Sequence, residues 1–120
     1  MNARDQLRSR TSPGEPPVKP EPLTGLTGFK RNLLLALSRL TGERPHGLEL
    51  KRKLEEFYDE EINHGRLYQN LSELVELGFV DKRPVDGRTN AYRLTTTGRL
   101  RLKAHHHWET ECLLAGEEAR

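Results

Sequence analysis

The polar side chains between His64 and Leu77 have the types and spacing needed to recognise another molecule. The run HGRLYQNLSELVEL places a guanidinium and two amides at Arg66, Gln69 and Asn70, within one helical turn. Their forked donors and acceptors match DNA base edges in the major groove. Arg66 could pair with guanine O6 and N7, and Gln69 or Asn70 with adenine N6 and N7. An ordinary solvated helix face is the alternative interpretation.

The same run has the apolar period that would hold these groups on a helix. Four residues recur at helical spacing and predict one buried face: Leu67, Leu71, Leu74 and Val75. Gly78 is typical of a helix end. Tyr68 has two interpretations, a ring at the edge of the core or a hydroxyl that reaches a phosphate, and its place beside the leucines favours the core.

Two further helices are expected before this one, at about residues 27–40 and 47–60. The predicted buried residues are Phe29, Leu33, Ala36, Leu37 and Leu40 in the first, and Leu50, Leu54, Phe57 and Tyr58 in the second. Lys30 and Arg31 open the first helix, where backbone N–H groups and positive charge together favour a phosphate. Residues 55–61 are strongly acidic and are expected to face away from DNA.

After the third helix the period changes to that of strands. Residues 79–83 and 90–94 predict two short strands, and Asp86-Gly87 between them indicates a hairpin turn. Arginine and lysine outnumber the acidic residues in this hairpin. Three of the cations are candidates for contacts with phosphates or with a minor groove: Lys82, Arg83 and Arg88. Arg88 is expected near the tip of the hairpin, where it can project.

The last predicted helix spans about residues 96–115 and carries one apolar stripe. The stripe consists of Leu100, Ala104, Trp108, Cys112 and Leu113. Burying Trp108 against a partner helix would fit a subunit interface. Cys112 has two interpretations, a redox-active thiol that bridges two subunits or a small buried hydrophobe, and its place on the stripe favours the second.

The three consecutive histidines, residues 105–107, invite a metal interpretation, but their spacing is against it. Adjacent residues on a helix point about 100° apart, so three in a row cannot share one ion. Only His107 with Glu111, or with Glu109 of a partner, has usable spacing. A single cysteine also excludes an internal disulfide and a cysteine-rich zinc site. We therefore expect no metal site and no cofactor.

Length and composition limit the classes of protein to which the chain can belong. At 120 residues, 32% charged and 33% hydrophobic, it suits one small domain with polar extensions. No apolar run reaches the roughly 20 residues that span a bilayer, and the N-terminus has no apolar leader. A cytoplasmic, nucleoid-associated location is expected. The chain has no convincing nucleophile triad and no glycine-rich phosphate loop, so an enzyme is not expected.

Residues 1–22 have the composition of a disordered tail. Five of the seven prolines fall there, with almost no large apolar residues. Arg4, Arg8 and Arg10 make its start basic, and a basic arm can enter a DNA minor groove. A solvated tail without a role is the favoured interpretation.

Three helices followed by a two-stranded hairpin is the element order of a winged helix-turn-helix domain. The fold expected is mainly α with a two-stranded β-wing. The DNA-binding domain would span residues 23–95, and a C-terminal dimerisation helix would span residues 96–116.

The residues around the third helix resemble a known family. The run 64–71, with Leu74 and then 78–80, resembles the Gly-x-Leu-Tyr-x-x-Leu-x-x-Leu-x-x-x-Gly pattern of PadR-like transcriptional regulators. Residues 88–98 resemble the second wing strand and the following turn of that family. The resemblance covers about residues 25–113 and looks most like the archaeal branch from salt-loving organisms.

The resemblance implies a homodimeric winged-helix repressor or activator. In such regulators the third helix enters the major groove, the wing touches the backbone or minor groove, and a C-terminal helix pairs the subunits. The expected partner is double-stranded DNA with a pseudo-palindromic operator. The alternative is a winged helix used only for protein–protein contact, and the basic wing and polar recognition face count against it.

Overall fold

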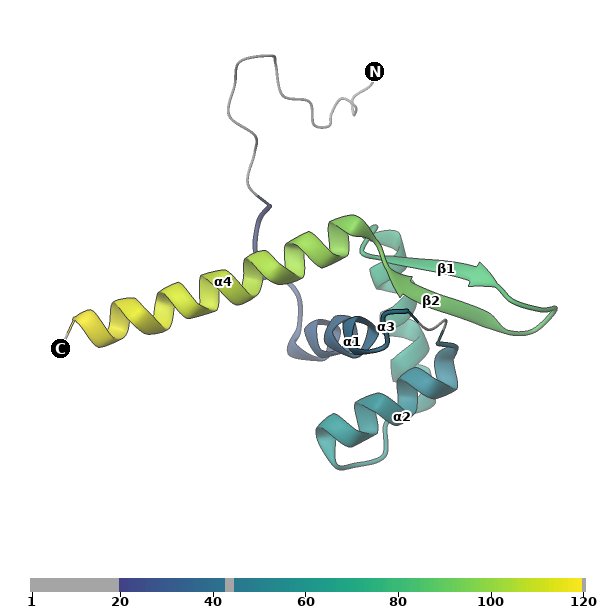
Figure 1. Cartoon of the computed structure of the whole chain (residues 1–120). Coiled ribbons are helices and arrows are strands. Elements are labelled where there is room, and N and C mark those ends of the chain that lie inside the picture. Colours follow the sequence, from purple (N-terminus) through teal and green to yellow (C-terminus); the bar gives the residue numbers. More distant parts are fainter. Residues whose placement is uncertain (1–19, 43–44, 120) are drawn as a thin grey trace, which may run out of the picture.

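The computed structural model describes residues 20–42 and 45–119 of the chain. The elements are α1 (Gly28–Arg39), α2 (Gly47–Tyr58), α3 (His64–Glu76), β1 (Val80–Pro84), β2 (Asn90–Leu94) and α4 (Thr96–Glu118). Figure 1 shows the first three helices packed together, with the hairpin extending to one side and α4 to the other. The expected winged helix-turn-helix fold is confirmed.

The helices begin and end where local side chains satisfy the free backbone groups. The Thr27 hydroxyl accepts from the Lys30 N–H (3.2 Å), and the Asn63 side-chain oxygen accepts from the Arg66 N–H (2.9 Å). The second helix ends earlier than expected, at Tyr58, because Asp59 takes the left-handed conformation with φ 54°. Gly78 takes φ 84° after α3, as expected of a helix end.

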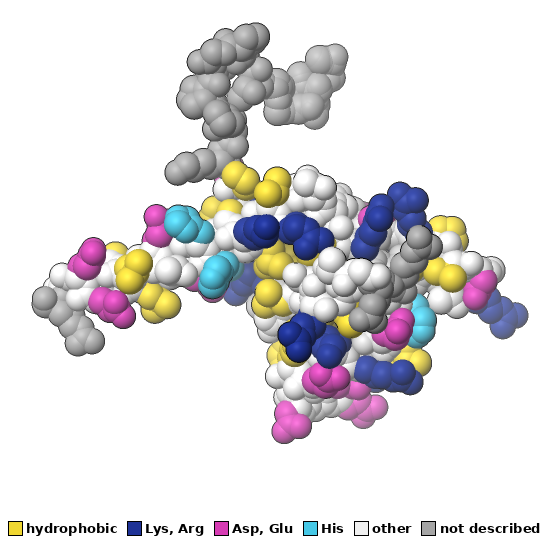
Figure 2. Space-filling model, in the orientation of Figure 1, with side chains coloured by type: hydrophobic (Ala, Val, Ile, Leu, Met, Phe, Trp, Pro, Cys, Tyr) yellow, Lys and Arg dark blue, Asp and Glu magenta, His cyan; other side chains and the backbone are white. Residues whose placement is uncertain are grey.

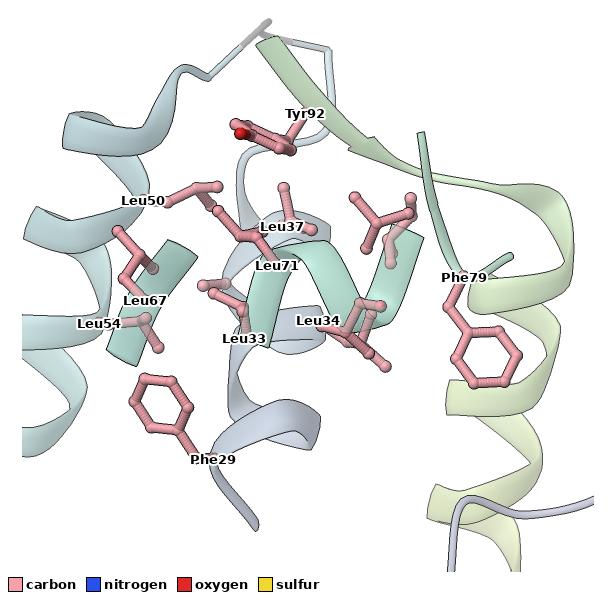
Figure 3. Packing of buried hydrophobic residues seen from close by; sticks show 14 of the residues in the cluster. Phe29, Leu33, Leu34, Leu37, Leu50, Leu54, Leu67, Leu71, Phe79 and Tyr92 are labelled. Atoms are coloured by element: carbon pink, nitrogen blue, oxygen red, sulfur yellow. The ribbon is translucent and has the colours of Figure 1, made fainter. Parts of the chain in front are cut away.

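The core lies where α1, α2 and α3 meet the base of the wing (Figure 3). Its largest fully buried side chains are Leu23, Leu33, Leu34, Leu50, Leu54, Ile62, Leu67, Leu71 and Leu74. Burying a leucine side chain contributes about 1.5–3 kcal/mol, so this cluster supplies the main driving force for folding. Leu40 and Val75, both expected to be buried, are partly buried at its edge.

Two predictions about the core need correction or extension. Phe57, predicted to be buried, is 46% exposed, whereas Tyr58, also predicted to be buried, is partly buried and closes that end of α2. The Tyr58 ring lies 6.0 Å from the Phe29 ring, and its hydroxyl accepts from the Asn32 amide at 2.8 Å. Leu34 lies off the predicted stripe but is fully buried, because α1 contacts α4 and β2 as well as α2 and α3.

The two strands pair antiparallel, with Val80 opposite Leu94 and Pro84 opposite Asn90. The predicted Asp-Gly turn is present, and one Asp86 carboxylate oxygen accepts from the N–H groups of Arg88 (3.0 Å) and Thr89 (2.9 Å). These hydrogen bonds lower the pKa of Asp86. The turn is therefore stabilised by hydrogen bonds between its own residues.

The N-terminal half of α4 packs on the domain, and its C-terminal half does not. The Leu23 N–H donates to Nδ1 of the buried His105 at 3.1 Å, which ties the segment before α1 to α4. Arg101 donates to the carbonyls of Glu21 and Pro22, the end of the predicted tail. Residues 1–19 of that tail lie outside the described residues. Every residue from 106 to 119 is exposed.

The helix α4 extends three residues beyond the predicted end at Ala115. Its 23 residues correspond to a length of about 35 Å at 1.5 Å per residue. Among the described residues, none of the helices combines the length and the hydrophobicity needed to cross a membrane.

The close approach of α4 to the strand region depends on Gly98, which is buried in its first turn. A Cβ at this position would lie 2.3 Å from the Phe79 carbonyl oxygen, which is backbone and cannot rotate away. We expect Gly98→Ala to lower the free energy of unfolding by about 1–3 kcal/mol, measured by urea denaturation. Gly116→Ala is the control, because nothing lies within 4 Å of its Cβ. Equal stability of both variants would contradict this packing.

Candidate nucleic-acid interface

The polar face of α3 is exposed along its N-terminal half, and Arg66 lies on it. The Arg66 guanidinium carbon is 3.8 Å from the centroid of the Phe29 ring on α1. A cation over an aromatic face at this distance is an attractive contact. Arg66 is therefore held against α1 in the free protein. To contact a guanine, its guanidinium would have to leave the Phe29 ring.

A hydrogen-bonded network joins the polar face of α3 to Lys30 of α1. The Lys30 ammonium donates to the Asn70 side-chain oxygen at 2.9 Å and to the Glu73 carboxylate. The Gln69 amide nitrogen donates to the other carboxylate oxygen of Glu73 at 2.7 Å. The Asn70 amide nitrogen donates to the Arg66 carbonyl at 2.8 Å. Lys30 lies 40 residues before Asn70 and 43 residues before Glu73 in the sequence.

The hydrogen bond from Lys30 is the largest cause of a lowered pKa at Glu73, and the bond from Gln69 is the next. Partial burial acts in the opposite direction but does not outweigh them. Glu73 is therefore a carboxylate at neutral pH. It keeps the Lys30 side chain, which is 14% exposed, within the protein surface.

Tyr68 lies half-buried between α3 and the start of α2. Its ring centroid is 4.6 Å from that of His64, and its hydroxyl would lie 1.8 Å from a Cβ at Gly47. The ring packs at the edge of the core, as its place beside the leucines favours. Its hydroxyl end lines a groove of about 370 Å³ between the start of α2 and the wing, which Arg88 also lines. The position of Tyr68 is thus compatible both with a ring at the edge of the core and with a hydroxyl that reaches a phosphate.

The wing carries three predicted contact residues, Lys82, Arg83 and Arg88, and all three are exposed. Arg83 pairs with Asp81 at 2.9 Å, and Arg93 approaches the same carboxylate at 3.4 Å. The hydrogen bond from Arg83 is the main cause of a lowered pKa at Asp81. Among the described residues, neither Lys82 nor Arg88 has an acidic partner within ion-pair distance. Figure 2 shows basic side chains at the far end of the wing and around its base.

The other two predicted DNA contacts lie at the N-terminus of α1 and are already engaged. Arg31 donates to the Leu26 carbonyl, and Lys30 is part of the α3 network. The structure therefore brings Lys30 to the polar face of α3, where it is an internal partner of Asn70 and shares the Glu73 carboxylate with Gln69. The contacts of Phe29 with Arg66 and of Lys30 with Glu73 carried no sequence signal, because each pairs residues that are distant in the chain. The spacing of Gln69 and Glu73, four residues apart on one helix, could have indicated their hydrogen bond.

The predicted dimerisation stripe is exposed along α4. The exposed fractions are 46% for Leu100, 41% for Trp108 and 71% for Leu113. Cys112 is also exposed, and Ala104 is half-buried. Leu114, 52% exposed, is a further exposed apolar residue on this half of α4 and was not predicted. Figure 2 shows hydrophobic side chains between acidic ones on this projecting end.

The histidines of α4 are separated by the packing of the helix. His105 is buried beside the Trp108 ring, with ring centroids 5.3 Å apart, whereas His107 is exposed and 3.3 Å from the Glu111 carboxylate. No group of three potential metal ligands is found within residues 20–42 and 45–119.

Comparison with known proteins identifies the family. Residues 36–104 match the family described as transcriptional regulator PadR-like. The structure of RosR from H. salinarum, a haloarchaeal PadR-like regulator, is 38% identical to this chain, with a TM-score of 0.66. The match covers 80% of this chain and 96% of RosR. The chain belongs to the PadR-like family.

More distant structures share the fold and extend the comparison. A MarR mutant from E. coli, solved in complex with operator DNA, is 25% identical with a TM-score of 0.58, covering 68% of this chain and 54% of that chain. A zinc-responsive MarR family member from Lactococcus lactis, ZitR, is 19% identical and shows the fold alone. None of the curated proteins compared with the chain matches it.

The family and the structural matches show what class of protein this is. It is a DNA-binding winged-helix transcription regulator of the PadR-like family, similar in structure to a haloarchaeal regulator. Members of this family and its structural neighbours are typically not enzymes.

The hydrogen bond between Lys30 and Glu73 predicts how the pKa of Glu73 responds to the loss of Lys30. Replacing Lys30 by Gln removes the largest cause of the lowered Glu73 pKa, so we expect that pKa to rise toward its ordinary value. A pH titration of the Glu73 carboxyl carbon by NMR measures it. Lys82→Gln is the control, because this exposed lysine lies on the wing. The same Glu73 pKa in the wild type and Lys30→Gln would show that the contact does not persist in solution.

Proposed function

We propose that two copies of this PadR-like chain bind a pseudo-palindromic operator, with α3 of each copy in a major groove. The carrying observation is the exposed polar face of α3 beside a basic wing, in a family of DNA-binding regulators. The two recognition helices would meet successive grooves about 10 base pairs apart. Binding would regulate transcription by occluding or recruiting the transcription machinery, in the cytoplasm at the nucleoid.

The contacts divide into those that specify a sequence and those that position the protein. Arg66 reads guanine, and the amides of Gln69 and Asn70 are the candidates for adenine. Tyr68 and three exposed residues of the wing contact phosphates or the minor groove: Lys82, Arg83 and Arg88. Lys30 and Arg31 contribute positive potential at the start of α1.

The free half of α4 supports a dimer. A helix of about 13 residues is marginal in water on its own, and residues 106–118 have no packing partner within the described part of the chain. Trp108, Leu113 and Leu114 are exposed apolar residues on this half. Pairing with α4 of a second copy would bury the stripe and stabilise the helix. The dimerisation residues proposed are Leu100, Ala104, Trp108, Cys112 and Leu113.

The test is fluorescence anisotropy with the duplex upstream of the chain's own gene and with a shuffled duplex, each titrated across salt. A preference for the native duplex, with log affinity falling linearly in log salt, supports the proposal and counts the phosphate contacts. Binding to neither duplex at any salt would favour the protein–protein alternative.

Arg66 and Arg88 form a matched pair of variants, because both remove one arginine from an exposed position. Arg66→Ala should cost about 1–3 kcal/mol of discrimination between the native and shuffled duplexes. Arg88→Ala should weaken both equally and reduce the salt slope by about one. The same anisotropy titrations measure both. An equal loss on the two duplexes for Arg66→Ala would contradict its assignment to a base.

Trp108 is expected to anchor the dimer, because it is the largest exposed side chain on the free stripe of α4. Truncating a buried aromatic anchor typically costs 2 kcal/mol or more. We expect Trp108→Ala to run as the 13.8 kDa monomer in light scattering, under conditions in which the wild type is a dimer. His106→Ala, on another side of the helix, is the control. A dimer mass for Trp108→Ala would remove Trp108 from the interface.

A further inference from the structure

We propose that Glu73 is a positioning residue that determines sequence specificity, by orienting the Gln69 amide and withholding Lys30 from phosphates. The inference rests on the proposed function, because it concerns how α3 reads a base. It assigns the reading of adenine to Gln69 and an internal structural role to Asn70.

Both carboxylate oxygens of Glu73 are used. One accepts from the Lys30 ammonium, and the other accepts from the Gln69 amide nitrogen at 2.7 Å. This bond directs the Gln69 nitrogen toward Glu73 and its carbonyl oxygen away from it. The carbonyl oxygen and the second N–H of the amide are then left to face a ligand. One acceptor and one donor on the same amide complement N6 and N7 of adenine.

The Asn70 amide is engaged at both ends within the protein. Its oxygen accepts from Lys30 at 2.9 Å, and its nitrogen donates to the Arg66 carbonyl at 2.8 Å. A base contact by Asn70 would have to break one of these bonds. Gln69, whose oxygen has no hydrogen-bond donor among the described residues, needs no such exchange. The two adjacent amides therefore have different roles.

Lys30 is the third residue of this hydrogen-bonded network. Its ammonium has two acceptors on α3 and its side chain is 14% exposed, so it is not available to a phosphate. A free lysine beside α3 would bind the backbone of every sequence and reduce discrimination. In return, Lys30 offsets the charge of Glu73, which is 41% exposed and would otherwise repel DNA.

The experiment uses the full chain and the duplex that the wild type selects from a randomised pool. Each base pair of this duplex is replaced in turn, and the affinities of the wild type and Gln69→Ala are measured. The base pair read by Gln69 is the one whose replacement lowers the affinity of the wild type but not that of Gln69→Ala. At this pair, discrimination is the ratio of the affinities for the selected and the replaced base pair. We expect Glu73→Gln to reduce this ratio about five- to ten-fold and to bind random duplex more tightly than the wild type does. Glu76→Gln removes the same charge from an exposed position on α3 and should keep the discrimination.

Two further variants separate orientation from charge and from loss of folding. Glu73→Asp keeps the charge but shortens the side chain by one methylene, so it cannot hold Gln69 and Lys30 together. It should lose discrimination as Glu73→Gln does, with unfolding curves confirming that both variants fold. In a Gln69→Ala background, Glu73→Gln should cause no further loss at this pair.

Each outcome separates this inference from the proposed function. Discrimination retained by both Glu73 variants, or an equal loss with Glu76→Gln, overturns the role of Glu73 and leaves the DNA-binding function standing. A wild type that selects no sequence from the pool overturns the specific operator and this inference with it. Loss of preference with Asn70→Ala instead of Gln69→Ala reverses the roles of the two amides and overturns the assignment.

Discussion

The burial of α1 on several sides at once holds the rest of the structure in place. Its leucines pack against α2 and α3, and its other side packs against α4 and β2 (Figure 3). Leu33, Leu34 and Leu37 are all essentially inaccessible to solvent. Because one helix contacts both α3 and the wing, core packing sets the position of these two elements relative to each other. A change in that packing would alter the whole interface.

The same helix controls the charges on the recognition face. Phe29 and Lys30, neighbours on α1, hold Arg66, Asn70 and Glu73 of α3. The free protein thus keeps its polar recognition groups in internal contacts, which reduces the entropy that they lose on binding. In the proposed complex, a base contact by Arg66 or Asn70 would replace one of these internal partners.

The fourth helix serves two structural purposes along its length. Its first half is tied to the domain by Gly98 against Phe79 and by His105 against Leu23. Its second half carries apolar residues that the described part of the chain leaves uncovered. In the proposed dimer, this helix would set the separation of the two winged-helix domains.

The local order of the fold was determined by the sequence itself. The apolar periods, the polar caps at Thr27 and Asn63, and the Asp86-Gly87 turn predicted the helices and the hairpin, because these signals act between residues a few positions apart. The exposed wing cations and the α4 stripe could also be named in advance. Helix ends were less well predicted, since Asp59 ended α2 early and α4 ran on past Ala115.

Only the tertiary structure decided which polar residues are paired. The burial of His105, the exposure of Phe57 and the hydrogen bonds of Lys30 to α3 all depend on elements that are distant in the chain. A sequence pattern records which face of a helix is apolar, but not which neighbour it meets or at what angle. Side-chain pairing depends on that angle, because a hydrogen bond forms only within a few tenths of an ångström of its preferred length.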